Sequence, residues 1–143
     1  IQVVNVKVAT SSTGTTAIPD DDTIPQSTEG NEYMTLAITP NNTANTLIIT
    51  VVVWISNSAN TVDTAALFQD STADALMAGQ HDGGSVIGDA GFTHYMSAGT
   101  ISATTFKVRA GAASGTTTFN GTAGARKYGG VLISSITIQE IKA

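Results

Sequence analysis

The stretch at residues 46–55, TLIITVVVWI, constrains the fold more than any other part of this chain, because it holds only apolar side chains and threonine. β-Branched and aromatic residues favour extended strands, and successive side chains along a strand point to opposite faces. One face would carry Leu47, Ile49, Val51, Val53 and Ile55, and the other would carry Ile48, Val52 and Trp54. A strand that is apolar on both faces needs a cover on each side.

Apolar residues alternate with polar ones along most of the chain, whereas no helical period is sustained. Val4, Val6 and Val8 alternate with Asn5 and Lys7 in this way. Clusters of Gly, Asn, Ser and Pro separate such segments, so we expect about eight to ten strands in an all-β, antiparallel jelly-roll sandwich that spans residues 1–143 as one domain. Residues 71–79, STADALMAG, could form one or two helical turns. The alternative is that the preceding TAALFQD ends as a strand that enters a tight turn at Asp70 and Ser71.

Composition excludes several kinds of stabilisation and several partners. The 143 residues contain no cysteine, so neither disulfides nor thiolate metal sites are available, and the core must be held by packing. The net charge of −5 opposes binding to nucleic acid phosphates. No apolar run reaches the roughly 18 residues of a membrane span. We therefore expect no nucleic-acid partner and no membrane insertion.

The second apolar face of residues 46–55 predicts self-association. No helices are expected that could cover it, and a second copy of the chain is the simplest cover. Residues 92–96 share this two-faced pattern, and so do residues 131–133, which we expect to start the last strand. The candidate interface residues are Ile48, Val52, Trp54, Tyr95, Val131 and Ile133. A closed barrel, or a loop laid over the sheet, is the alternative.

Residues 18–30, IPDDDTIPQSTEG, contain three consecutive aspartates between two Ile-Pro pairs. Adjacent carboxylates in an extended segment point apart, which disfavours a shared metal ion, and the spacing of a helix-loop-helix calcium loop is absent. Pro19 and Pro25 stiffen the segment. We predict a structural connector, with a calcium site or a receptor contact at Asp20, Asp21 and Asp22 as alternatives.

Four stretches of the chain resemble a domain that recurs in structural proteins of tailed phages and prophages. They are IPDDDTIPQSTEG at 18–30, AGTISATTFKVRAG at 98–111, TTTFNG at 116–121 and YGGVLISSITIQEI at 128–141. The last also resembles the final strand of tumour-necrosis-factor-like and complement globular-head jelly rolls, which form homotrimers. The resemblance implies a trimeric, non-enzymatic head at the C-terminal end of a longer virion protein, exposed at the tip of a tail fibre or similar appendage that touches the host.

The chain carries none of the common catalytic motifs, so we expect no enzyme, no catalytic residues, no metal and no cofactor. The aspartates at 63, 70, 74, 82 and 89 could form a glycosidase-like pair only if the fold brought two together. His94 is expected in the core or in an interface. Arg109 and Lys107 should face away from the core, with Arg109 either paired across a subunit boundary or solvated.

The loop at residues 79–91, GQHDGGSVIGDAG, is the predicted recognition surface, because functional residues of a rigid scaffold concentrate on its loops. An ordinary surface loop without a recognition role has the same composition and is the alternative. The candidate ligand-binding residues are Gln80, His81, Asp82, Ser85 and Asp89. They would contact a host-surface glycan or protein. A carbohydrate-binding module of a secreted or coat protein is the second functional hypothesis, with Trp54 as a conceivable stacking platform.

Overall fold

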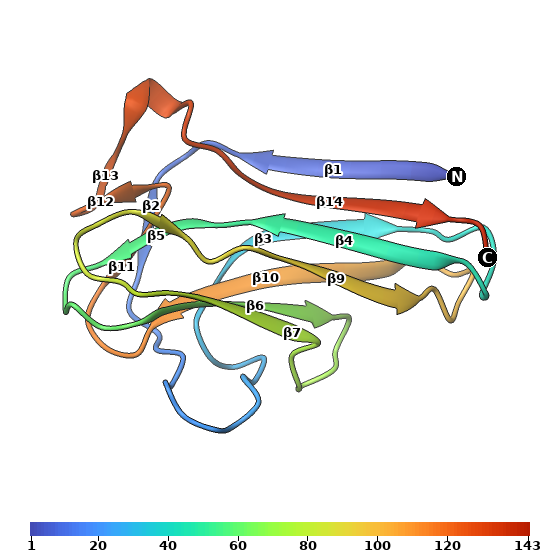
Figure 1. Cartoon of the computed structure of the whole chain (residues 1–143), viewed down its shortest axis with the longest axis horizontal. Coiled ribbons are helices and arrows are strands. Elements are labelled where there is room, and N and C mark those ends of the chain that lie inside the picture. Colours follow the sequence, from blue (N-terminus) through green and yellow to red (C-terminus); the bar gives the residue numbers. More distant parts are fainter.

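Two four-stranded antiparallel sheets pack face to face in the computed structural model, which describes residues 1–143 (Figure 1). The first, called the β4 sheet here, has the order β1 (Gln2–Val8), β14 (Ser134–Ile141), β4 (Thr46–Val52) and β9 (Phe92–Ser97). The second, the β6 sheet, has the order β3 (Asn31–Ile38), β10 (Thr104–Ala112), β6 (Asp63–Gln69) and β7 (Met77–His81). Both termini lie at the same end of the sandwich (Figure 1).

A smaller sheet, the β11 sheet, forms the opposite end of the molecule. Its order is β2 (Ser12–Gly14), β11 (Thr117–Phe119), β5 (Trp54–Asn57) and β8 (Gly88–Asp89). The hairpin of β12 (Gly121–Thr122) and β13 (Ala125–Arg126) lies beside it (Figure 1). Along the sequence, β1, β4, β9 and β14 enter the β4 sheet while β3, β6, β7 and β10 enter the β6 sheet, which is the strand exchange of a jelly roll. The predicted all-β antiparallel sandwich is therefore confirmed.

The core lies between the two large sheets and is built by the predicted alternation. Leu47, Ile49, Val51, Val53 and Ile55 are at most 2% exposed. Opposite them, Met34, Leu67, Phe106 and Val108 of the β6 sheet join the same cluster, and Val4, Val6 and Val8 pack against its edge. The predicted inner face of residues 46–55 is thus confirmed.

Residues 46–55 form two strands rather than one, because the chain leaves the β4 sheet at Val53 and enters the β11 sheet at Trp54. The backbone N–H of Val53 donates to Asp89 Oδ1 at 2.9 Å, and the Val53 carbonyl accepts from the N–H of Ala90 at 3.0 Å. These bonds satisfy the backbone where the strand is interrupted.

The acidic segment at residues 18–30 covers the outer face of the β6 sheet. The N–H of Ser27 donates to the Ala73 carbonyl at 2.8 Å, and the N–H of Ala75 donates to the Pro25 carbonyl at 3.0 Å. Ile18, Ala66 and Phe68 are at most 2% exposed although none belongs to the central core cluster. The segment therefore shields a second, smaller apolar cluster.

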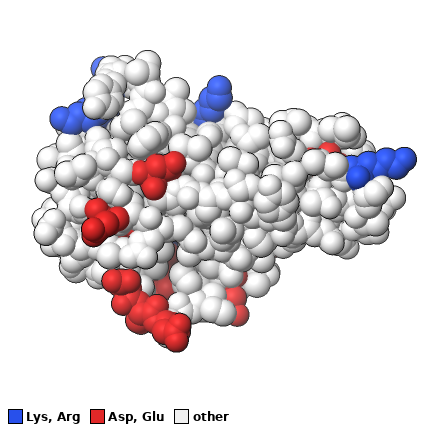
Figure 2. Space-filling model, in the orientation of Figure 1, with Lys and Arg blue, Asp and Glu red and all other residues white.

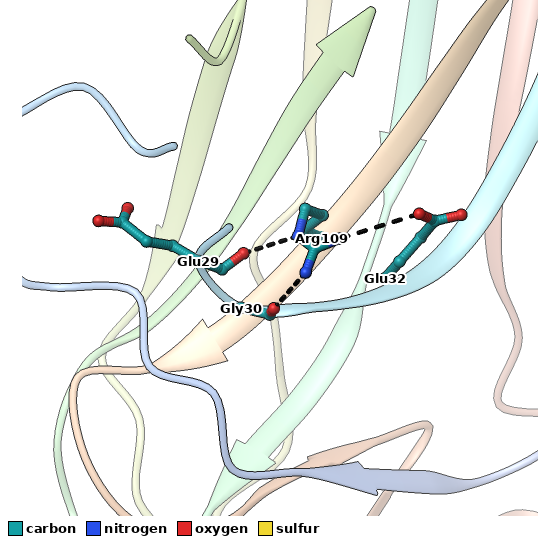
Figure 3. A network of polar contacts seen from close by, with 4 residues as sticks. All are labelled: Glu29, Gly30, Glu32 and Arg109. Carbon is teal, nitrogen blue, oxygen red and sulfur yellow. Dashed lines mark hydrogen bonds and ion pairs between the residues drawn. The ribbon is translucent and has the colours of Figure 1, made fainter. Parts of the chain in front are cut away.

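Arg109 of β10 holds the end of this segment (Figure 3). Its Nε donates to the Glu29 carbonyl and one terminal nitrogen donates to the Gly30 carbonyl, both at 2.7 Å. The other terminal nitrogen lies 3.8 Å from a Glu32 carboxylate oxygen. Arg109 does face away from the core, as predicted, but its partners belong to its own chain.

Of the two alternatives for residues 71–79, the tight turn after the preceding strand is confirmed: β6 ends at Gln69, φ of Asp70 is 51°, and β7 begins at Met77 without an intervening helix. Residues 131–133 precede β14 instead of starting it: Tyr128, Gly129 and Gly130 all have positive φ and form a 3₁₀ turn that projects from the sandwich (Figure 1). That turn is the only helical element, and no helix is long and apolar enough to cross a membrane.

Candidate functional site

The five residues predicted for ligand binding lie in separate parts of the structure. Asp89 is structural, since its Oδ1 accepts from the N–H groups of both Val53 and Gly91. His81 Nε2 lies 3.2 Å from the Val86 carbonyl and so braces the loop from within. Gln80 lines a hollow beside Asp20 and Asp21 of the acidic segment. The structure therefore does not gather these side chains into one group.

Gln80, Asp82, Ser85 and Asp89 are exposed, and His81 is half-buried. Ser85 lines a cavity of about 300 Å³ at the end of the molecule where the β11 sheet lies, which we call the threonine pocket. Its lining residues are Thr13, Asn57, Ser58, Ser85, Thr116, Thr118, Thr122, Ala123 and Gly124. None of them is charged, and six carry a hydroxyl group.

The walls of the threonine pocket are held by hydrogen bonds between separate segments. Ser56 Oγ donates to the Gly121 carbonyl at 2.8 Å, and the Gly124 N–H donates to Thr118 Oγ1 at 3.1 Å, which fixes the β12–β13 hairpin against the β11 sheet. Thr122 Oγ1 donates to the Ser85 carbonyl at 2.8 Å and so ties the hairpin to the 79–91 loop. The pocket is thus part of the folded framework.

A buried carboxylic acid lies behind the loop that carries Ser85. Asp63 is 0% exposed and neither of its oxygens has a hydrogen-bond partner. Burial raises the pKa of Asp63 to about 6, and the amide of Asn57 and the ring of His81 oppose that shift. A side chain at Gly83 would meet Asp63 Oδ2, so the loop packs directly on this acid.

Tyr33 shares this buried polar region. Its hydroxyl also lacks a partner, and burial, followed by the charge of Asp63, raises the pKa of Tyr33 to about 12. Its ring stacks on Phe119 of β11. Two unsatisfied polar groups so close to the pocket are unusual in a folded protein, where buried polar groups are nearly always hydrogen-bonded.

A second buried acid, Glu140, lies at the opposite end of the sandwich and is fully satisfied. Its carboxylate accepts from Gln2, Asn41 and Asn45, at 2.8, 2.8 and 2.6 Å. The Asn45 amide foremost, with Gln2 and Asn41, lowers the pKa of Glu140 to about 2 against the effect of burial. This acid serves to fix the turn between β3 and β4 to the last strand.

Most of the aspartates considered for catalysis have structural partners. Asp70 accepts from the N–H of Thr105 and from Thr104 Oγ1, both at 2.8 Å, and Asp74 accepts from Gln26 Nε2 at 2.9 Å. No group of three or more His, Asp or Glu side chains is placed to hold one metal ion. In the acidic segment, Asp21 accepts from the backbone and hydroxyl of Thr23, and all three aspartates, Asp20, Asp21 and Asp22, are exposed. Figure 2 shows acidic side chains gathered at the lower left of the molecule.

The outer face of the β4 sheet holds three of the six predicted interface residues. Ile48 and Val52 are half-buried there, and Tyr95 is 65% exposed. Trp54 belongs to the β11 sheet and is half-buried beside Asp89. Val131, 76% exposed, and Ile133, half-buried, lie between the projecting turn and β14. His94 is half-buried on β9, where burial lowers its pKa.

The threonines of the pocket carry no sequence signal that could have identified them. They come from β2, from β11 and the residue before it, and from β12, and threonine is frequent throughout the chain. Only tertiary structure brings them together.

Comparisons with known proteins leave the family open. No family model and no curated protein matches. Among solved structures, the structure of infectious bursal disease virus, Gt strain, is similar to this chain. The alignment covers 99% of this chain and 38% of the viral chain, at 10% sequence identity and a TM-score of 0.48. The structure of infectious bursal virus-derived T=1 particles is also similar. That alignment covers 99% of this chain and 36% of the viral chain, at 9% sequence identity and a TM-score of 0.47. The chain spans less than two fifths of those proteins, and at such scores the likeness carries no argument about function.

Proposed function

We propose that this chain is a non-enzymatic structural domain of a virion, which forms the trimeric tip of a tail fibre or similar appendage and contacts the host surface. The observation that carries the proposal is the outer face of the β4 sheet. Val3, at 57% exposed, and Tyr95, at 65%, lie there on the two edge strands, and the row between them holds Gln139 of β14 and Ile48 of β4. This row of side chains crosses the whole sheet.

The rest of the same face is almost without charge. Register and alternation place Asn5, Thr137, Thr50 and Thr93 in the next row. Lys7, at the end of β1, is the single charged residue among the outward positions of the four strands. Protein surfaces that associate are depleted in charge at their centre and enriched in aromatic residues. The covering segment 18–30 lies on the other sheet, so this face has no cover within its own chain.

Assignment to a virion rests on the four stretches that resemble structural proteins of tailed phages. They include the acidic segment, which the fold uses as a cover, and the residues of β10, β11 and β14. A tip domain must survive outside the cell and present loops to a surface. A sandwich whose loops are held by hydrogen bonds suits that role. Recognition would then belong to the loops at the end of the molecule that carries the β11 sheet.

The experiment is light scattering on the purified chain. We expect three times the chain mass of 14.6 kDa at micromolar concentration. Ile48→Asp should reduce the mass to that of one chain, because an unpaired charge in an apolar interface is strongly disfavoured. Thr35→Asp is the matched control, since Thr35 is exposed on the outer face of the β6 sheet. A wild-type mass of 14.6 kDa would refute the trimer.

A carbohydrate-binding module of a secreted or coat protein is the second candidate. The uncharged threonine pocket favours it. A stable monomer that binds a neutral saccharide would support this candidate over the virion tip.

A further inference from the structure

We propose that the threonine pocket is the recognition site and that it binds a neutral, hydroxyl-rich ligand, such as one or two sugar rings of a host glycan. The inference rests on the recognition role proposed above and gives it a location and a ligand chemistry. It moves the predicted site away from His81 and Asp82, and of the five predicted ligand residues it keeps only Ser85.

The lining excludes charged ligands. No Lys, Arg or His lines the cavity to pair with an anion, and no Asp or Glu lines it to pair with a cation. A charged group that entered would lose water without gaining a partner, which is strongly unfavourable. The ligand must therefore be neutral.

The hydroxyl groups of the pocket still have capacity for hydrogen bonds. Thr13, Ser85 and Thr116 make none through their side-chain oxygens within the chain, so each can donate and accept. Thr118 Oγ1 and Ser58 Oγ accept from backbone N–H groups and keep their hydrogens free to donate. A ligand that uses these groups must both donate and accept, as the hydroxyls of a saccharide do, and the mostly apolar remainder of the cavity surface suits the C–H face of a sugar ring.

The geometry of the pocket is fixed before any ligand arrives. Asn120 begins the β12–β13 hairpin at a φ of 56°, and its buried amide donates to the Val8 and Thr10 carbonyls at 2.7 and 3.2 Å. Ser134 Oγ donates to its Oδ1 at 2.7 Å. Ala123, with a φ of 49°, turns the tip of the hairpin over the cavity. Preorganisation of this kind lowers the entropic cost of binding.

The small volume of the threonine pocket and its lack of aromatic residues limit the affinity for a ligand. A cavity of about 300 Å³ lies at the lower end of the range for small-molecule sites. No aromatic ring lines it, so the stacking that strengthens many sugar sites is missing. We expect a dissociation constant on the order of 1 mM for a single saccharide. Three pockets on one trimer would raise the avidity for a surface that displays many copies.

The test is an NMR titration of the isotope-labelled chain with glucose, galactose, mannose, N-acetylglucosamine and their common disaccharides. Glucuronate and glucosamine serve as charged counterparts. We expect at least one neutral sugar to shift the amides of Ser85, Thr116, Thr118 and Gly124, and both charged sugars to bind more weakly. The double variant Thr13→Val and Thr116→Val, which keeps the side-chain shapes and removes two free hydroxyls, should weaken binding at least 10-fold. Thr35→Val is the control and should bind as the wild type does.

The proposal is overturned if no neutral sugar shifts the pocket amides at 50 mM or so, well above the expected constant. It is equally overturned if the shifts map to another surface, or if the charged sugars bind more tightly. Light scattering on the same samples separates this result from the proposed function. Pocket binding by a monomer would retain the site and refute the trimeric tip, whereas a trimer without pocket binding would do the reverse.

Discussion

The ring of Tyr33 on β3 stacks on the ring of Phe119 on β11, with centroids 4.6 Å apart and an angle of 5° between the planes. This contact joins the β6 sheet to the β11 sheet beneath the threonine pocket. Phe119 is fully buried, and the residue before it in β11, Thr118, lines the pocket. The stack therefore supports the floor of the candidate site.

Tyr33→Phe should leave this contact intact and remove a buried hydroxyl that has no partner. We expect the free energy of unfolding to stay unchanged or to rise by up to about 1 kcal/mol, because an unsatisfied buried polar group is destabilising. Tyr33→Ala should lower it by roughly 3 kcal/mol through loss of the ring. Urea unfolding of both variants checks this; a clear loss of stability in Tyr33→Phe would reveal a hydrogen bond to the hydroxyl.

Asp63→Asn should change how stability depends on pH. The pKa of Asp63 in the folded chain, about 6, lies above the ordinary value of 3.8. The folded chain therefore holds the proton more tightly than the unfolded chain does. This contribution to the free energy of unfolding is fully present below about pH 4 and is lost as the pH rises through 6. The shift corresponds to about 3 kcal/mol at most.

Relative to wild type, Asp63→Asn should thus gain about 2–3 kcal/mol between pH 4 and pH 8. Urea unfolding at both pH values measures the difference. Asp82→Asn, an exposed change in the same loop, is the control and should stay within about 0.5 kcal/mol of wild type. Parallel pH profiles for Asp63→Asn and wild type would show that the acid is paired in solution.

Glu140→Gln should produce the opposite pH response. The pKa of Glu140, about 2, lies below the ordinary value of 4.5, so its stabilisation is present above pH 4.5 and is lost as the pH falls through 2. An amide would also turn an NH₂ group toward the donors of Gln2, Asn41 and Asn45. We expect Tm to drop by several degrees at pH 7 and the difference to shrink near pH 2.5. Thermal melts of this variant beside Glu32→Gln, a partly exposed acid, check the prediction.

Arg109→Ala should loosen the acidic segment. Two carbonyls, of Glu29 and Gly30, lose their donors, which we expect to cost about 2 kcal/mol and to speed proteolysis within residues 18–30. Lys107→Ala is the control because Lys107 shares the strand and the outward face. Glu32→Gln should change stability by less than about 0.5 kcal/mol, since the ion pair is partly exposed and 3.8 Å long. Equal proteolysis of the two alanine variants would contradict the anchoring role of Arg109.

The sequence by itself determined the class of the fold and the inward face of its central strands. β-Branched residues and period-two alternation act locally, and they place Leu47, Ile49 and Val51 on one side whatever the strand pairs with. The connector role predicted for the acidic segment, with its prolines, also agrees with the segment observed at residues 18–30.

Tertiary structure alone decided which face each segment covers and which side chains meet. Arg109 finds two carbonyls some 80 residues away, and the pocket combines Thr13 with Thr116, about a hundred residues apart. Strand order is set by the summed burial of a whole sandwich, which no local pattern encodes. For the same reason, the break at Val53, the burial of Asp63 and the place of the threonine pocket became visible only once the sheets were assembled.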